Sequence, residues 1–236
     1  MDPSAEKYFD WSPYSYVGDN PVKRTDIDGK DWDVVINHDQ KTITIQANFK
    51  SFSGNTNTIQ EAANNWNAQS GKFNYVVGEG DKSISYSVNF AFSVNDETNA
   101  SAENFISVLP DDAKVFTDRT SVDRDGNTTT AEGLSDGKNI AVKESNSDNS
   151  QIAAHEMGHN LGMEDNTGVM KGQVGGKTLE NKSVKETLGH SGIGNGVKGA
   201  TTNAKLQNRT EIGTKPDGFQ NGKLVKNAIW NEKNFK

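Results

Sequence analysis

The chain has 236 residues, a formal net charge of -7 and no cysteine. This length suits one globular domain, or one domain with a short appendage. The missing cysteines exclude disulfides, thiolate metal sites and cysteine nucleophiles. Hydrophobic residues make up 32% of the chain, and no apolar run approaches the ~18 residues of a spanning helix, so we expect no membrane span. The first residues have no basic stretch before an apolar one, so we expect no signal peptide in this chain.

The charge is divided unevenly between two parts of the chain. Residues 1–166 carry 13 Lys and Arg against 27 Asp and Glu, a balance of -14. Residues 167–236 carry 12 against 5, a balance of +7. Nucleic-acid binding needs a basic surface, and the larger part is acidic, so we expect no nucleic-acid partner. The basic part is expected to dock on the acidic body or to be solvated.

The predicted elements begin after a boundary near residue 30. Residues 1–30 form a first segment, aromatic and turn-forming without a helical or strand period, that closes on an Asp-Gly turn. Alternating apolar residues predict a hairpin over 32–36 and 42–49, and an i, i+3, i+4, i+7 pattern predicts a helix over 58–68. Further predicted elements are strands over 73–77, 84–94, 115–116 and 140–142, a helix over about 149–163 with Asp148 as N-cap, and a helix ending within 184–188.

This order favours an α/β (α+β) fold with a mixed twisted sheet and two major helices. We expect one domain over residues 31–236. Its C-terminal part, about 167–236, is rich in Gly and Asn and is expected to form a subdomain.

The candidate metal-binding and catalytic residues lie in the second long predicted helix. Residues 155–159 read His-Glu-Met-Gly-His, which places His155 and His159 one turn apart on one helix face. Two such imidazoles bind one zinc ion, which lowers the pKa of a bound water. Glu156, rotated by ~100°, is suited to take the proton of that water as a general base. The spacing therefore predicts a hydrolytic Zn²⁺ site.

A catalytic zinc site needs a third protein ligand. Glycine at position 162 is suited to end the helix because it adopts positive φ easily, and Asp165 follows three residues later with an oxygen ligand. Gly168-Val169-Met170 places a methionine in a turn just after these residues, and an ordinary core methionine is one interpretation of it. The alternative third ligands are Glu180, Glu186 and His190.

The string over residues 155–165 resembles the extended zinc motif of the metzincin endopeptidases, H-E-x-x-H-x-x-G-x-x-H followed by a Met-turn. It departs from that motif at Asp165, where most of the clan has histidine and some bacterial members have aspartate. The resemblance covers about residues 32–190 and implies a zincin-like fold and hydrolysis of a protein or peptide substrate. It also implies a Met170 that lies below the zinc without binding it. The matching residues are His155, Glu156, His159, Gly162 and Met170.

Residues 1–29 resemble the end of the RHS-repeat-associated core of bacterial polymorphic toxins. The matching text includes Ser-Pro-Tyr-Ser-Tyr at 12–16, Asp-Asn-Pro at 19–21 and Asp-Ile-Asp-Gly at 26–29, with isoleucine where the family usually has proline. The resemblance implies that residues 31–236 are a toxin tip, secreted or delivered to a target cell by a larger chain, with a cognate immunity protein as a partner.

Three alternatives stay open at this stage. Residues 123–127 resemble half of a calcium loop, so a structural Ca²⁺ site competes with an ordinary turn. The domain is either a peptidase or a non-catalytic zincin that binds another protein, and a closed site with His190 as fourth ligand would favour the second. Hydrolysis of a non-peptide amide is a third function. For a peptide substrate, we expect strand 139–143 to offer an edge for pairing.

Overall fold

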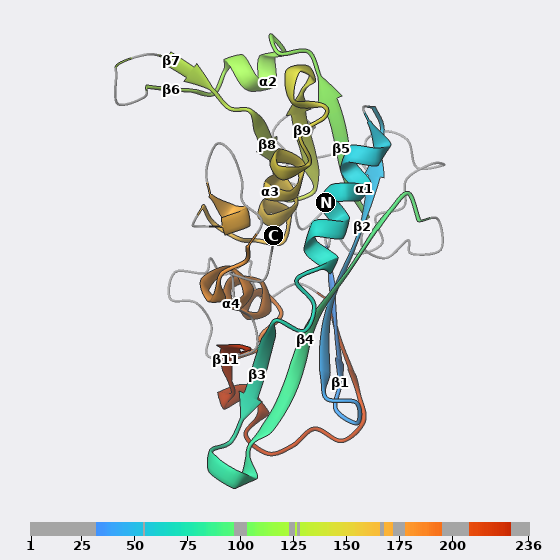
Figure 1. The fold of residues 1–236 in the computed structure, drawn as a ribbon, viewed down its shortest axis with the longest axis vertical. Coiled ribbons are helices and arrows are strands. Elements are labelled where there is room, and N and C mark those ends of the chain that lie inside the picture. Colours follow the sequence, from blue (N-terminus) through green and yellow to red (C-terminus); the bar gives the residue numbers. More distant parts are fainter. Residues whose placement is uncertain are drawn as a thin grey trace, which may run out of the picture.

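The computed structural model describes residues 32–53, 55–96, 103–122, 126, 128–165, 168–171, 178–194 and 208–227. These residues form a nine-stranded mixed sheet, a separate two-stranded ribbon and helices (Figure 1). The predicted α/β fold is therefore confirmed. Residues 1–30 lie outside the described residues, and so does the calcium-loop candidate at 123–127 apart from Gly126.

The strands of the main sheet follow the order β11-β3-β4-β2-β5-β9-β8, and β1 pairs with both β2 and β10. Strand β2 pairs in parallel with β4 along one edge, while β1 and then β5 occupy its other edge. The bounds are β1 Asp33–Asn37, β2 Thr42–Ser51, β3 Phe73–Val77, β4 Ile84–Val94, β5 Glu103–Leu109, β8 Gly133–Ser135, β9 Asn139–Lys143, β10 Asn208–Ile212 and β11 Lys223–Lys226; the ribbon pairs β6 Thr120–Val122 with β7 Thr128–Thr130.

Two long helices cover one face of this sheet. Helix α1 (Thr56–Asn67) packs on β4, helix α3 (Ser150–Asn160) packs on β8 and β9, and the two helices contact each other (Figure 1). The apolar face predicted for α1 is buried, and its Trp66 donates from Nε1 to the carbonyl oxygen of Ala154 at 2.8 Å. This buried bond ties α3 to α1, and thereby to the sheet.

Three local predictions are wrong or need adjustment. Residues 115–116 are not a strand, because they lie in the short helix α2 (Lys114–Thr117). The N-cap of α3 is Asn149, whose side chain accepts from the N–H of Gln151, rather than Asp148. The same helix ends at residue 160, three residues before its predicted end. The later helix is present as α4 (Asn181–His190), which ends two residues after the predicted 184–188.

The strand expected to offer an edge for a substrate lies inside the sheet. Strand β9 pairs in parallel with β5 on one side and antiparallel with β8 on the other, so both of its edges are occupied. That expectation for residues 139–143 is wrong. Within the described residues, the sheet ends at this side with β8.

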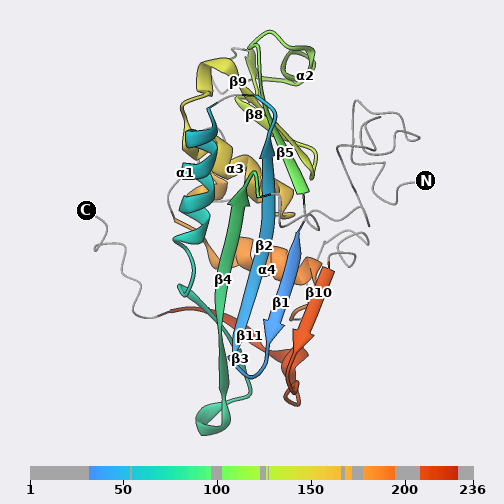
Figure 2. The ribbon, with the colours of Figure 1, turned by 90° about the vertical axis from the view of Figure 1, so that its right-hand side faces the viewer.

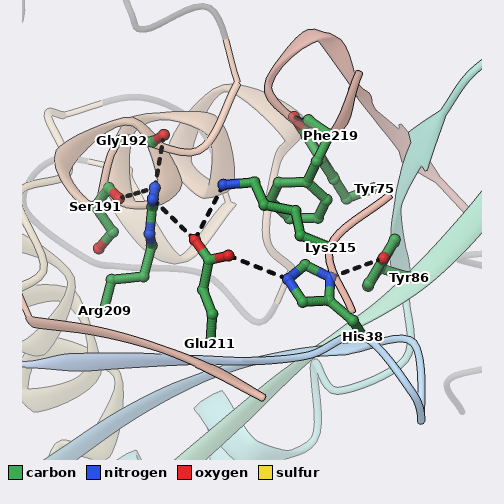
Figure 3. Close-up of polar contacts among 9 residues, drawn as sticks. All are labelled: His38, Tyr75, Tyr86, Ser191, Gly192, Arg209, Glu211, Lys215 and Phe219. Atoms are coloured by element: carbon green, nitrogen blue, oxygen red, sulfur yellow. Dashed lines mark hydrogen bonds and ion pairs between the residues drawn. The ribbon is translucent and has the colours of Figure 1, made fainter. Parts of the chain in front are cut away.

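The described C-terminal residues belong to the main sheet. Strand β10 pairs in parallel with β1, and β11 pairs antiparallel with β3 (Figure 2). Residues 208–227 therefore add two strands to the main sheet rather than form a subdomain of their own. A buried histidine anchors this connection: His38 lies 3.2 Å from Glu211 of β10 and 3.0 Å from the hydroxyl of Tyr86 (Figure 3). Among the described helices, none is long and apolar enough to cross a membrane.

Candidate metal centre

Helix α3 presents the two predicted histidines on one face. Its opposite stripe, formed by Ala153, Met157 and Leu161, is buried in the core as predicted, with exposed fractions of at most 3%. This packing fixes the rotation of the helix about its axis. His155 and His159 consequently point to the same place, with their rings perpendicular and their centroids 4.6 Å apart.

Three ligand atoms converge beside this helix. The Nε2 atoms of His155 and His159 lie 3.0 Å apart, and Asp165 Oδ1 lies 3.3 Å from the first and 3.5 Å from the second. Of the described residues, these alone form a group of three or more His, Cys, Asp or Glu side chains with ligand atoms so close together. The structure thus brings together the three residues predicted as metal ligands.

The hydrogen bonds of the two rings show which nitrogen atoms carry protons. His155 donates from Nδ1 to the carbonyl oxygen of Val169 at 3.0 Å, and His159 donates from Nδ1 to that of Met163 at 2.8 Å. A carbonyl oxygen only accepts, so both protons sit on Nδ1 and a neutral ring has a lone pair on Nε2. Burial first, and then His159, lower the pKa of His155, which favours its neutral form.

This arrangement fits a zinc ion. Two Nε2 atoms that face each other, together with a carboxylate oxygen, form a donor set that suits a cation. Zinc bonds of 2.0–2.1 Å in a tetrahedron separate the ligand atoms by ~3.4 Å, close to the three separations found here. Backbone carbonyls that hold the far ring nitrogen are also the usual support of metal-binding histidines. The donor set of two imidazoles and one carboxylate leaves one tetrahedral position for water or substrate.

The turn that carries Asp165 begins at Gly162. This glycine has φ of +75°, a conformation that side chains disfavour, and the chain reverses there as the sequence predicted. A Cβ at this position would also lie 2.5 Å from Nε2 of His190. Glycine is therefore needed at this position both for the backbone conformation and for the close approach of His190.

Glu156 lies beside the cluster and is 5% exposed. Burial, and then the negative charge of Asp165, raise the pKa of Glu156 to about 8. Its side chain touches the start of β8: a Cβ on Gly133 would lie 2.8 Å from Oε1 of Glu156 and 2.9 Å from its Cγ. The edge strand of the sheet therefore runs directly against the predicted general base.

Met170 packs against helix α3 at Gly158, between the two histidines, and the role that the resemblance implies for it stays a prediction. It is fully buried in the short 3₁₀ turn Gly168–Met170, next to the carbonyl of Val169 that holds His155. A Cβ on Gly158 of α3 would overlap the Met170 sulfur, so the glycine between the two histidines makes room for this methionine.

The alternative third ligands lie elsewhere. Glu186 and His190 project from α4 toward the backbone of the turn after α3, and Glu180 precedes α4; the metal-binding group contains none of the three. Sequence reasoning missed the roles of Gly133 and Gly158. The Gly in His-Glu-Met-Gly-His was a usable signal for Gly158, since a glycine inside a helix calls for a packing reason. Gly133 lies in an irregular segment and has no comparable signal.

Comparison with known proteins gives no relative: no family model, no curated protein and no solved structure matches this chain.

Proposed function

We propose that this chain is a zinc-dependent peptidase whose metal is held by His155, His159 and Asp165. The observation that carries the proposal is the convergence of two imidazole Nε2 atoms and one carboxylate oxygen at separations of 3.0–3.5 Å. A zinc ion held there would polarise a scissile carbonyl and lower the pKa of a coordinated water toward ~7. The resemblance to metzincins supports a peptide bond as the target.

Glu156 is the proposed general base. Its carboxylate would accept a proton from the attacking water on one oxygen and deliver it to the nitrogen of the leaving amine. With a pKa of about 8 in the ion-free site, the carboxyl of Glu156 is mostly protonated near neutral pH. A nearby cation would lower this pKa and favour the carboxylate that a general base requires. The contact with Gly133 limits the rotamers of Glu156.

Strand β8 replaces residues 139–143 as the proposed substrate edge. It ends the described sheet, and its first residue touches Glu156. An extended peptide that pairs with β8 would bring its backbone past the general base. The resemblance of residues 1–29 to RHS-associated cores supports delivery of this peptidase as a toxin tip, with an immunity protein as its natural inhibitor.

The mechanism is tested with Glu156→Gln. Zinc content and hydrolysis of a fluorescein-labelled casein are measured for the wild type and for this variant, with Glu61→Gln on the exposed side of α1 as the matched control. We expect both variants to keep about one zinc ion, and only Glu156→Gln to lose at least 100-fold in rate. A Glu156→Gln protein with wild-type proteolysis would refute the mechanism. Hydrolysis of small amides but not of casein would favour the non-peptide substrate.

A non-catalytic zincin remains the second candidate, and the structure bears on it directly. A closed site with a fourth protein ligand, for example His190, would favour it. Nε2 of His190 instead donates to the carbonyl oxygen of Gly162 at 2.9 Å. The described donor set thus supports an open site, and hence the peptidase.

A further inference from the structure

Helix α4 faces the backbone turn that joins α3 to Asp165. Three of its side chains each bond to one backbone atom of this turn, at successive places along residues 161–164. The three bonds run from Thr187 Oγ1 to the carbonyl oxygen of Leu161 (3.0 Å), from His190 Nε2 to the carbonyl oxygen of Gly162 (2.9 Å) and from the N–H of Glu164 to Glu186 Oε2 (3.1 Å).

The spacing of these side chains explains how one helix makes all three bonds. Positions 186, 187 and 190 lie within about one turn, so their side chains share one side of α4. Carbonyl oxygens released at the end of α3 need such donors, because they have no partner within their own helix. Thr187 and His190 therefore supply donors to the carbonyl oxygens of Leu161 and Gly162, while Glu186 supplies an acceptor to the N–H of Glu164.

Burial of the Glu186 carboxylate costs more free energy than a structural contact alone would require. It is 5% exposed, its Oε1 has no hydrogen bond within the described residues, and Lys182 Nζ lies 3.4 Å from that atom. Burying a carboxylate costs free energy unless it is paired and hydrogen-bonded, and its ion-pair partner Lys182 is 52% exposed. Its presence next to the N–H of Glu164 is better explained by the need to fix that N–H, one residue before Asp165.

The C-terminal end of helix α4 is bound to strand β10 of the sheet. Arg209 of β10 donates from one guanidinium nitrogen to the carbonyl oxygens of Ser191 and Gly192, which follow the end of α4 (Figure 3). Its other terminal nitrogen lies 2.9 Å from Glu211, which in turn contacts the buried His38. This chain of contacts connects the turn of Asp165, through α4, to strands β10 and β1.

We propose that Glu186, Thr187 and His190 are positioning residues that hold Asp165 in the place where it completes the metal site. The inference rests on the proposed function, because it assigns Asp165 as a metal ligand. Within the described residues, the group of converging ligand atoms comprises His155, His159 and Asp165 and does not include these three. They act through the backbone of residues 161–164, and Asp165, which is exposed on its outer side, depends on that backbone for its direction.

Paired substitutions separate this role from a general effect on folding. Thr187→Val removes the hydroxyl but keeps the shape, and Thr187→Ser restores the hydroxyl. Glu186→Met removes the acceptor, and Glu186→Gln keeps one. The controls on α4 are the exposed Lys185→Gln and the buried Val184→Ala, which lowers stability without touching the turn. Zinc affinity is measured by competition with a chromophoric chelator, and Tm is measured alongside.

We expect Thr187→Val and Glu186→Met to weaken zinc binding by about tenfold, as substitutions behind metal ligands do. The conservative variants and both controls should stay within about twofold of the wild type, although Val184→Ala loses stability. In an Asp165→Ala background, Thr187→Val and Glu186→Met should have almost no further effect, because the ligand they position is gone. Equal losses in both backgrounds, or no loss in either, would overturn the inference.

A metal-free measurement distinguishes this inference from the proposed function. Hydrogen exchange of the Glu164 amide is compared in chelator-treated wild type, Glu186→Met and Lys185→Gln; we expect about tenfold faster exchange in Glu186→Met only. Equal exchange in all three would overturn the inference and leave the zinc site untouched. A wild type that binds no zinc, despite a protected Glu164 amide, would overturn the proposed function, and with it the assignment of Asp165 as the positioned ligand.

Discussion

Replacing Glu156 by glutamine should stabilise the metal-free protein, and more so as the pH rises. A carboxyl whose pKa is raised in the folded state binds protons more tightly there than in the unfolded chain. Its burial is therefore tolerated below the unfolded value of 4.5 and becomes destabilising as the pH rises toward about 8. Each pH unit between these values costs about 1.36 kcal/mol. Between pH 5 and 7 the cost grows by about 2.5 kcal/mol.

The assay is urea unfolding of the wild type and of Glu156→Gln at pH 5, 6, 7 and 8, with a chelator present throughout. Because both proteins are compared at each pH, the titration of groups that do not interact with Glu156 cancels in the difference between the two free energies of unfolding. Any pH-independent effect of the amide adds only a constant to this difference. We expect this difference to rise by about 2.5 kcal/mol in favour of the variant between pH 5 and 7, or by about half of that where the buried site admits water. The exposed control Glu61→Gln should give a constant difference. A difference for Glu156→Gln that also stays constant with pH would show that the pKa of Glu156 is not raised in the folded protein.

Three further changes test the packing around the site and the anchor of the C-terminal strands. Gly133→Ala would place a Cβ 2.8 Å from Oε1 of Glu156, so we expect a loss of about 1–3 kcal/mol in unfolding free energy, together with slower hydrolysis; wild-type values of both would contradict this. Gly158→Ala should lower Tm despite the better helix propensity of alanine, because the new methyl overlaps Met170; a higher Tm would show that the contact is relaxed. Burial is the largest influence on the Glu211 carboxyl and acts to raise its pKa, but the contacts with His38 and two cationic side chains outweigh it and hold the pKa below its ordinary value. Glu211 therefore stabilises the fold above pH ~4.5, and this contribution is lost as the pH falls through its folded pKa. In Glu211→Gln, the free energy of unfolding should therefore fall less steeply as the pH is lowered below ~4.5. The same fall as in the wild type would contradict this.

The parts of the fold that the sequence predicted are those with a strong local period. Helix α1 shows its buried face through the spacing of Ile59 and Trp66, and strand β4 through strict alternation. The sequence could not reveal that β10 pairs with β1 across more than 170 residues, because parallel pairing depends on distant contacts and leaves no local pattern. Residues 115–116 were misjudged because a short apolar pair fits a strand and a single helical turn equally well.

In the candidate site, as in the fold, the sequence predicts what depends on local spacing and not what depends on distant contacts. The positions of His155, His159 and Asp165 follow from helical spacing and one glycine turn, both of which are local rules. The functions of Glu186 and Thr187 depend on how α4 packs against that turn, which the sequence does not reveal. Glu186 was considered as a ligand because of its residue type, and only the contact of its carboxylate with the N–H of Glu164 shows what it does.

The metal content of the purified protein tests most directly whether His155, His159 and Asp165 hold a zinc ion. The wild type and a His155→Ala, His159→Ala double variant are incubated with zinc, desalted and analysed by elemental mass spectrometry, with circular dichroism to show that both are folded. We expect about one zinc ion per wild-type chain and none above background in the double variant. A folded wild type without zinc, or a double variant that retains as much zinc as the wild type, would contradict the proposed zinc site.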